Sequence, residues 1–307
     1  MTTTEPLDAT LESSILGHLP LEILLEILLS VCASSQAGYC ALTSVSKQLR
    51  QLLHQDGLRV VPVTLEEISQ LHAFKCFLSA YPGIGQEVRY LWIMDRGYAR
   101  GTGFVEPIIL ACNRVVSLAC STKTLGVICS QPTLEHVHCK ELTLVEPWHR
   151  WMTLLPHPHT AQFCNQITHL RVSSGLGPDF NTAHFANLTH LAFSTSPIVE
   201  FMERHLAHLE PLQHLTMLVV TVFWWREQIN GSASLEAAKL DDRIAILQCE
   251  KESDWSELNI WVECVSGGLG VWGRARRAQR QMRIMNKVVR NRVLPRKRAV
   301  ALDGQYL

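Results

Sequence analysis

The 307-residue sequence lacks any apolar run long enough to cross a membrane. A membrane-spanning helix needs about 18 or more consecutive apolar residues. The longest candidate, residues 215–225, predicts a buried strand instead. Charged residues make up only 18% of the chain and hydrophobic residues 47%, which is typical of a folded protein and not of a disordered one. We therefore expect a folded chain with ample length for a core and no membrane partner.

The ten cysteines lack any C-x-x-C spacing, which argues against both a zinc ribbon and an encoded disulfide framework. Cys120, Cys139 and Cys249 stand at apolar positions, where a free thiol behaves as a small hydrophobe. Such usage suits a reducing compartment. We expect the chain to be cytoplasmic, nuclear or both.

Catalytic signatures are also missing, since the sequence has no G-x-S-x-G elbow, no P-loop and no Rossmann motif. The fourteen histidines include His136 and His138, which would share a face of an extended segment, but no second ligand pair stands at zinc-site spacing. We expect no catalytic residues, no metal ligands and no cofactor. A hydrolase with a cysteine nucleophile stays an alternative, because the chain is rich in both cysteine and histidine.

What the chain does have is an unusual apolar helix near its start, in residues 19–28. Pro20 suits the first turn of a helix, where its missing N–H costs nothing. One face of this helix carries Ile23, Leu24, Ile27 and Leu28, and Leu21, Leu25 and Leu29 make the other side apolar too. A helix that is apolar nearly all round must be covered on more than one side. We expect another protein to supply part of that cover.

A second helix is predicted after Ser34 or Ser35, either of which can cap it. Its apolar stripe consists of Tyr39, Leu42, Val45, Leu49, Leu52 and Leu53. Two short amphipathic helices cannot bury two apolar faces between themselves, which again indicates a partner.

The sequence LPLEILLEIL followed by VSKQLR resembles an F-box over residues 16–58. This resemblance implies a helical unit that docks on the Skp adaptor of cullin-based SCF ubiquitin ligases. It implies an adaptor-facing surface made of Leu19, Pro20, Ile23, Leu24, Ile27, Leu28, Val45, Ser46, Leu49 and Arg50. The connector at residues 32–38 departs from the family, since it lacks the apolar-acidic pairs that many F-boxes carry there. Two alternatives are a secretory signal peptide, which the acidic residues oppose, and an ordinary core helix.

The middle of the chain repeats a frame of apolar-x-x-Leu-x-apolar seven times. The segments are residues 88–93, 115–120, 139–144, 167–172, 188–193, 215–220 and 244–249, with starts separated by 27, 24, 28, 21, 27 and 29 residues. A period in the twenties is typical of leucine-rich-repeat solenoids, in which short strands form a parallel curved sheet. Helices are predicted over residues 65–78 and 198–209. His169 and His190 occupy the same slot of adjacent repeats, which predicts a histidine ladder. Another kind of α/β domain is the alternative.

Charge is segregated at the C-terminal end, because residues 274–298 contain eleven Lys or Arg and no acidic residue. An amphipathic helix is predicted here, with a seam of Trp272, Ala275, Ala278, Met282, Met285, Val289 and Val293. This helix would cap the open end of the solenoid with a solvated basic face. A nuclear-import signal at Pro295, Arg296, Lys297 and Arg298, or in the cluster from Arg274 to Arg283, is another interpretation. Nucleic acid is not expected as a partner, because no aromatic residue interleaves the arginines.

The predicted fold is α/β, with a short helical F-box, an irregular leucine-rich-repeat-like solenoid and a basic C-terminal helix. The predicted domains are a flexible N-terminus at 1–14, the F-box unit at 15–58, the repeat domain at 59–270 and the basic helix and tail at 271–307. Residues 242–275, with Asp-x-Arg and Gly-Gly-x-x-x-Trp-x-x-Ala, also resemble the ends of fungal F-box proteins. The implied function is a non-catalytic substrate receptor of an SCF-type ligase. It would bind the Skp adaptor, through it a cullin, and an unknown protein client; the alternative is a non-ligase interaction scaffold.

Overall fold

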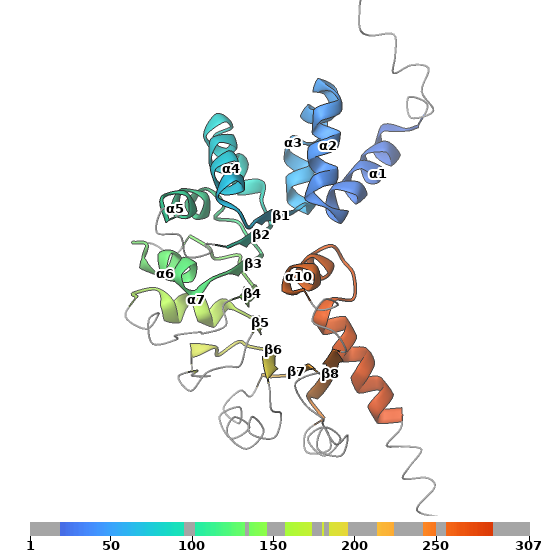
Figure 1. Ribbon diagram of the computed structural model, residues 1–307, viewed down its shortest axis with the longest axis vertical. Helices are drawn as coiled ribbons and strands as arrows, with labels where there is room; N and C mark the ends of the chain where they lie inside the picture. Colours follow the sequence, from blue (N-terminus) through green and yellow to red (C-terminus); the bar gives the residue numbers. More distant parts are fainter. Residues whose placement is uncertain are drawn as a thin grey trace, which may run out of the picture. The chain divides into compact units, whose positions relative to one another are not determined.

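The computed structural model describes residues 19–94, 102–132, 135–145, 157–173, 180, 184–195, 214–223, 242–249 and 256–284. The fold is α/β: helices come first, and eight parallel strands then form an open sheet in which β1 to β8 follow chain order (Figure 1). The chain divides into two compact units after Leu118.

The elements of the first unit are α1 (Leu21–Ser34), α2 (Gln36–Val45), α3 (Lys47–Val60), β1 (Pro62–Leu65), α4 (Ile68–Ala80), the 3-10 helix η3 (Ile84–Glu87), β2 (Tyr90–Ile93) and α5 (Thr102–Ala111). The boundary between the two units lies within the strand β3 (Ser117–Cys120). The second unit has α6 (Thr122–Ser130), β4 (Glu141–Leu144), α7 (Thr160–Gln166), β5 (His169–Val172), β6 (His190–Thr195), β7 (Met217–Phe223), β8 (Ile244–Cys249) and α10 (Glu257–Val265). A last helix covers residues 270–284.

Three helices stand where the sequence predicts two. The predicted second helix is wrong as a single element, because Ser46 adopts an extended backbone (φ −152°, ψ 159°) between α2 and α3. The Ser46 hydroxyl accepts a hydrogen bond from the Leu49 N–H at 3.1 Å, so it caps a new helix. Ser35 caps α2 in the same way by accepting from the Gly38 N–H at 3.0 Å. Each break in the helices therefore falls at a serine that satisfies a free backbone donor.

All seven predicted repeat segments contain a strand, and β1 is an eighth that the sequence analysis missed. The fourth position of the frame is buried in the first six segments, at Leu91, Leu118, Leu142, Leu170, Leu191 and Leu218. The predicted frame is wrong in the seventh segment. It places Leu247 in line with Leu218, whereas in the structure Leu218 pairs with Ile244 and Leu247 pairs with Thr221. Since an odd shift reverses the two faces of a strand, Leu247 lies on the face opposite to the one predicted. The predicted helix over 65–78 corresponds to α4, and the one over 198–209 lies outside the described residues.

The first unit joins the three helices to the start of the sheet. The Gln36 side chain accepts hydrogen bonds from the Thr64 backbone N–H at 2.6 Å and from the Thr64 hydroxyl at 2.9 Å. On α3, the His54 ring lies edge-on to Tyr81, with centroids 4.5 Å apart. A strand at the edge of a sheet leaves backbone donors unpaired. Gln36 satisfies one of them, so α2 and β1 stabilise each other.

The sheet of the second unit has helices on both sides. Figure 1 shows α6 and α7 beside β3 to β5 on one side of the strands, with α10 and residues 270–284 on the other side. On the latter side a core is formed by Ala192, Met217, Val219, Ala245, Leu247, Cys249, Ile260, Val271 and Ala275. The first part of the predicted helical seam is present, since Ala275 belongs to this core and Trp272 and Ala278 pack against it. Met285, Val289 and Val293 of the predicted seam lie outside the described residues. The predicted position of this helix, at the open end of the solenoid, is wrong, because the seam covers a face of the sheet. Small residues such as Ala192, Ala245 and Ala275 allow the helix to pack closely on the strands.

No helix in the described ranges is long and apolar enough to cross a membrane.

We predict that Gln36→Leu lowers the free energy of unfolding by about 1–3 kcal/mol, because it leaves the Thr64 N–H without its acceptor. Gln48→Leu is the matched control, since Gln48 lies exposed on α3 and its replacement should change stability by about 0.5 kcal/mol or less. Urea denaturation measures both variants. Equal stability of the two would contradict the proposed role of Gln36 at the sheet edge.

Candidate protein-binding surfaces

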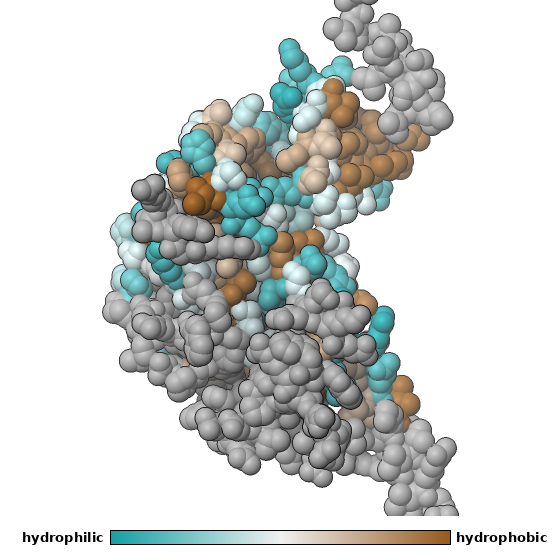
Figure 2. Space-filling view, viewed as in Figure 1, coloured by the Kyte–Doolittle hydropathy of each residue, from teal (hydrophilic) through white to brown (hydrophobic). Residues whose placement is uncertain are grey.

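The first candidate surface is an exposed apolar stripe on α1. Ile23, Ile27 and Val31 follow one another at four-residue spacing and are 46%, 44% and 40% exposed, whereas Leu28 and Cys32 on the other side are buried. Leu21 is 61% exposed at the start of the helix, and Val45 at the end of α2 is 72% exposed. Figure 2 shows apolar side chains gathered over α1. Apolar side chains exposed together mark an interaction site.

The structure separates the predicted adaptor-facing residues into three groups. Pro20, Ile23, Ile27, Val45 and Arg50 are exposed, and Leu19, Leu24, Ser46 and Leu49 are half-buried. Leu28 is 6% exposed and packs among the three helices, so its side chain is not part of the surface. The stripe also contains Leu21 and Val31, which the sequence analysis did not assign. No sequence signal distinguished the packed side from the exposed side, because α1 is apolar nearly all round.

Two of these residues serve the helices as well as the surface. Ser46 caps α3, and the Arg50 guanidinium donates from Nε to the Thr43 carbonyl oxygen at 2.9 Å. These contacts fix the corner at which α2 ends and α3 begins. The corner in turn presents Val45 to solvent.

The second candidate surface lies on the helices that cover β5 to β8. The buried Arg171 of β5 donates from Nε to the Glu257 carboxylate of α10 at 2.7 Å. The α10 helix then turns into residues 270–284 through glycines. Gly270 has φ +49°, and a Cβ there would lie 2.1 Å from the Cys264 sulfur, so only glycine fits. The ion pair and the turn together fix the position of the last helix.

The predicted histidine ladder is confirmed beneath that helix. His169 and His190 are paired in register, and their rings stack with centroids 4.1 Å apart and an interplanar angle of 15°. Trp272 lies edge-on to both rings at 5.4 Å. Burial lowers the pKa of His169 to about 4, with further lowering from His190 and Arg276. The pKa of His190 is lowered by burial and by Arg276. Both rings are therefore neutral at pH 7 and act as packing groups.

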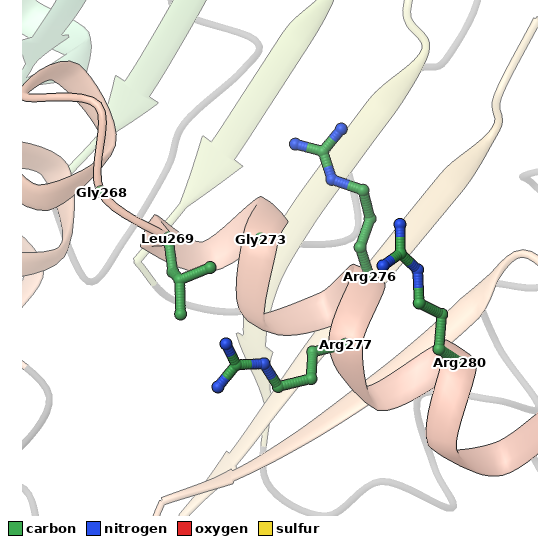
Figure 3. Close-up of a pocket in the computed structure, with 6 residues that line it drawn as sticks. All are labelled: Gly268, Leu269, Gly273, Arg276, Arg277 and Arg280. Carbon is green, nitrogen blue, oxygen red and sulfur yellow. The ribbon is translucent and has the colours of Figure 1, made fainter.

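The outer side of residues 270–284 carries an arginine-lined hollow of about 320 Å³. Its lining consists of Gly268, Leu269, Gly273, Arg276, Arg277 and Arg280, drawn in Figure 3. The figure shows Arg276 and Arg280 extending in parallel from successive turns, and Arg277 turning back toward Leu269. This surface can attract an anionic group by charge and by hydrogen bonds.

Metal ligation finds no support in the geometry. Within the described ranges, no group of three or more His, Cys, Asp or Glu side chains is placed to hold a metal ion. His136 is buried and His138 is exposed, so the expectation that the two rings share a face is wrong. The chain turns at these residues and does not run extended.

Seven of the ten cysteines are buried, including Cys120, Cys139 and Cys249, as their apolar positions predicted. Burial raises the pKa of Cys112 and of Cys164 to about 12, which holds both as thiols. The exposed Cys76 has its sulfur 3.9 Å from His72 Nε2 on α4. A nucleophile pair also needs a group that orients the base. In the described part of the chain, no carboxylate hydrogen-bonds the His72 ring.

We predict that the histidine ladder makes stability depend on pH. The folded-state pKa of His169 is about 4, below its ordinary value of 6.5, so the unfolded chain takes up a proton before the folded chain does. Stability is therefore fully present above pH 6.5 and is lost as the pH falls from 6.5 to 4. The free energy of unfolding, measured in urea at pH 7.5 and 5.0, should fall less in His169→Gln than in the unmodified chain. His138→Gln, at an exposed ring, should keep the original pH dependence, and an unchanged dependence in His169→Gln would refute the prediction.

The comparison with known families places the apolar stripe in a recognised module, because the F-box domain matches residues 16–60. The match covers α1, α2 and α3 and leaves the sheet and the last helices outside it. No curated protein and no solved structure matches the chain. F-box domains bind the Skp adaptor, which supports a substrate-receptor role in an SCF ubiquitin ligase in general terms. The chain therefore carries an F-box domain, formed by its first three helices.

Proposed function

We propose that this protein is the substrate receptor of an SCF-type ubiquitin ligase, docking on the Skp adaptor through the F-box. The observation that carries the proposal is the exposed stripe of Ile23, Ile27 and Val31 within the matched F-box domain. Packing among α1, α2 and α3 leaves this stripe without cover from the neighbouring helices. These side chains are already partly buried, so covering their exposed part on a partner stabilises a complex by about 1 kcal/mol each.

The proposed mechanism requires no catalytic residue in this chain. The F-box attaches the receptor to the adaptor and, through it, to a cullin, while the rest of the chain holds a protein client. Linking the two binding events raises the effective concentration of the client near the conjugating enzyme. F-box proteins are generally adaptor subunits and not enzymes, which agrees with this role.

We further propose that β1 to β8 form a degenerate leucine-rich repeat of the fungal F-box type. The parallel order and the buried leucines of the repeated frame support this assignment. The proposed sites of action are the cytoplasm and the nucleus. The import signal proposed at Pro295, Arg296, Lys297 and Arg298 lies outside the described residues.

We predict that Ile23→Asp/Ile27→Asp weakens binding of the purified Skp adaptor by about 100-fold or more. The double variant removes two apolar contacts of about 1 kcal/mol each. It also places two carboxylates against an apolar partner, which adds the cost of taking their charges out of water. Surface plasmon resonance with the immobilised adaptor measures the effect.

The matched control is Ile68→Asp, because Ile68 is 41% exposed on α4, outside the F-box. It should bind the adaptor as the unmodified chain does. Equal binding by the double variant would refute the proposed interface. Adaptor binding without cullin in the purified complex would instead favour the alternative of a non-ligase scaffold.

We also predict the cysteine reactivity expected of a non-catalytic chain. An iodoacetamide probe on the folded protein should label the exposed Cys40 and Cys76, and should reach the seven buried cysteines only after unfolding. Cys40→Ser/Cys76→Ser should lose most of the labelling. Mass spectrometry locates the label. If one of the two exposed cysteines, Cys40 or Cys76, reacted about 100-fold faster than the other, the result would support the alternative of a hydrolase with a cysteine nucleophile.

A further inference from the structure

The covered face of the second unit restricts where a client binds. In a solenoid of parallel strands, one face of the sheet is commonly the binding surface. Here α10 and residues 270–284 occupy that face over β6 to β8, with Met217, Val219 and Ala245 buried beneath them. A client that used this face over β6 to β8 would have to displace that apolar core, so an exposed surface is the better candidate. The outer side of the last helix is the surface that replaces it.

Three arginines on that outer side form no ion pair with a carboxylate in the part of the chain that the structure describes. Arg276, Arg277 and Arg280 are exposed, and no acidic side chain in the described ranges lies within ion-pairing distance of them. Arg274 on the same helix differs, because its guanidinium donates to the Glu263 carboxylate at 2.6 Å. Like charges one helical turn apart destabilise a helix by a few tenths of a kcal/mol. A bound anion would remove that repulsion.

The hollow between these arginines also has an apolar part. Leu269 is 45% exposed at its edge, and Gly268 and Gly273 line it without side chains. A Cβ on Gly273 would lie 3.1 Å from the Leu269 side chain, so a larger residue there would crowd the leucine. The hollow therefore offers a small apolar contact beside three guanidinium groups, and its volume of about 320 Å³ is that of a few side chains.

We propose that this arginine hollow binds an acidic segment of the client protein, in which aspartate or glutamate residues flank an apolar side chain. The carboxylates pair with Arg276, Arg277 and Arg280, whose planar forks suit two-point hydrogen bonding. The apolar side chain rests on Leu269. This assignment rests on the proposed receptor function and names the class of its client.

The same arginines would attract a nucleic acid by charge, but none of the described residues that line the hollow is aromatic. Single strands bind through aromatic side chains interleaved with positive charge. Trp272, the aromatic residue of this helix, packs against His169 and His190. An apolar leucine among the arginines matches a peptide better than it matches a base.

The test uses the full chain and a fluorescent peptide, acetyl-Gly-Glu-Glu-Leu-Glu-Glu-Gly-amide, with fluorescence anisotropy as the readout at low salt. A peptide with glutamine in place of each glutamate should bind at least tenfold more weakly. Replacing the leucine by alanine should weaken binding about threefold. Preference for a (dT) oligonucleotide of equal charge would overturn the proposal in favour of a nucleic-acid surface.

The variant Arg276→Gln/Arg277→Gln/Arg280→Gln should lose at least tenfold in affinity for the acidic peptide. Arg283→Gln is the matched control, because Arg283 is exposed on the same helix and does not line the hollow, so it should lose less than twofold. Leu269→Ser should remove the preference for leucine over alanine and keep the preference for glutamate. Equal binding of the glutamate and glutamine peptides, or no loss in the triple variant, would overturn the proposal.

Adaptor binding separates this inference from the function on which it rests. The triple arginine variant should bind the Skp adaptor as strongly as the unmodified chain, and Ile23→Asp/Ile27→Asp should bind the acidic peptide as strongly. Loss of peptide specificity with intact adaptor binding would overturn the inference alone. Loss of adaptor binding in the unmodified chain would overturn the receptor function.

Discussion

Parallel strands this short are stable only when both faces of their sheet are covered, and the second unit depends on that constraint. Alternate residues along β5 to β7 serve the two faces. Leu170, Leu191 and Leu218 form one buried column, and Arg171, Ala192 and Val219 form the next. The first column holds the leucine of the repeated frame and lies on the face of the strands opposite to the core that α10 covers. The second column must be covered by other residues, and the chain supplies α10 and residues 270–284 for that purpose. The last helices are therefore part of the core and not an appendage.

A buried charge adds specificity to this cover. Arg171 is 4% exposed, and its partner Glu257 comes from α10. A buried arginine without a carboxylate would be strongly unfavourable, whereas an apolar face alone would tolerate α10 at several positions. The pair thus ties α10 to β5 at one defined point. Gly270 then turns the chain at a place where no side chain fits. The positions of Arg276 and Arg280 on the last helix therefore depend on this turn and on the ion pair between Arg171 and Glu257.

The sequence predicted the structure correctly where a periodic pattern was compatible with only one arrangement of the chain. Seven strands and the stacked pair of His169 and His190 followed from spacing, and the burial of the cysteines followed from their apolar positions. The sequence was misleading where two arrangements would bury apolar residues equally well. The seam of the last helix suited a sheet face as well as a sheet end, and β8 is apolar at Ile244 and at Leu247 alike, so its frame was ambiguous. The exposed side of α1 was ambiguous for the same reason. The break at Ser46 and the pairing of Arg171 with Glu257 depend on single contacts, which leave no period to detect.

The two proposed surfaces differ in chemistry in a way that fits two kinds of association. Exposed isoleucine and valine on α1 are unfavourable in water at all times, so a partner that covers them is bound persistently. Arginines remain hydrated when they are free, and pairs formed at the protein surface gain little net free energy. A carboxylate segment on Arg276, Arg277 and Arg280 can therefore leave at small cost. Persistent apolar attachment at one site and exchangeable ionic attachment at the other are what a receptor requires if it stays with its ligase while successive clients arrive and depart.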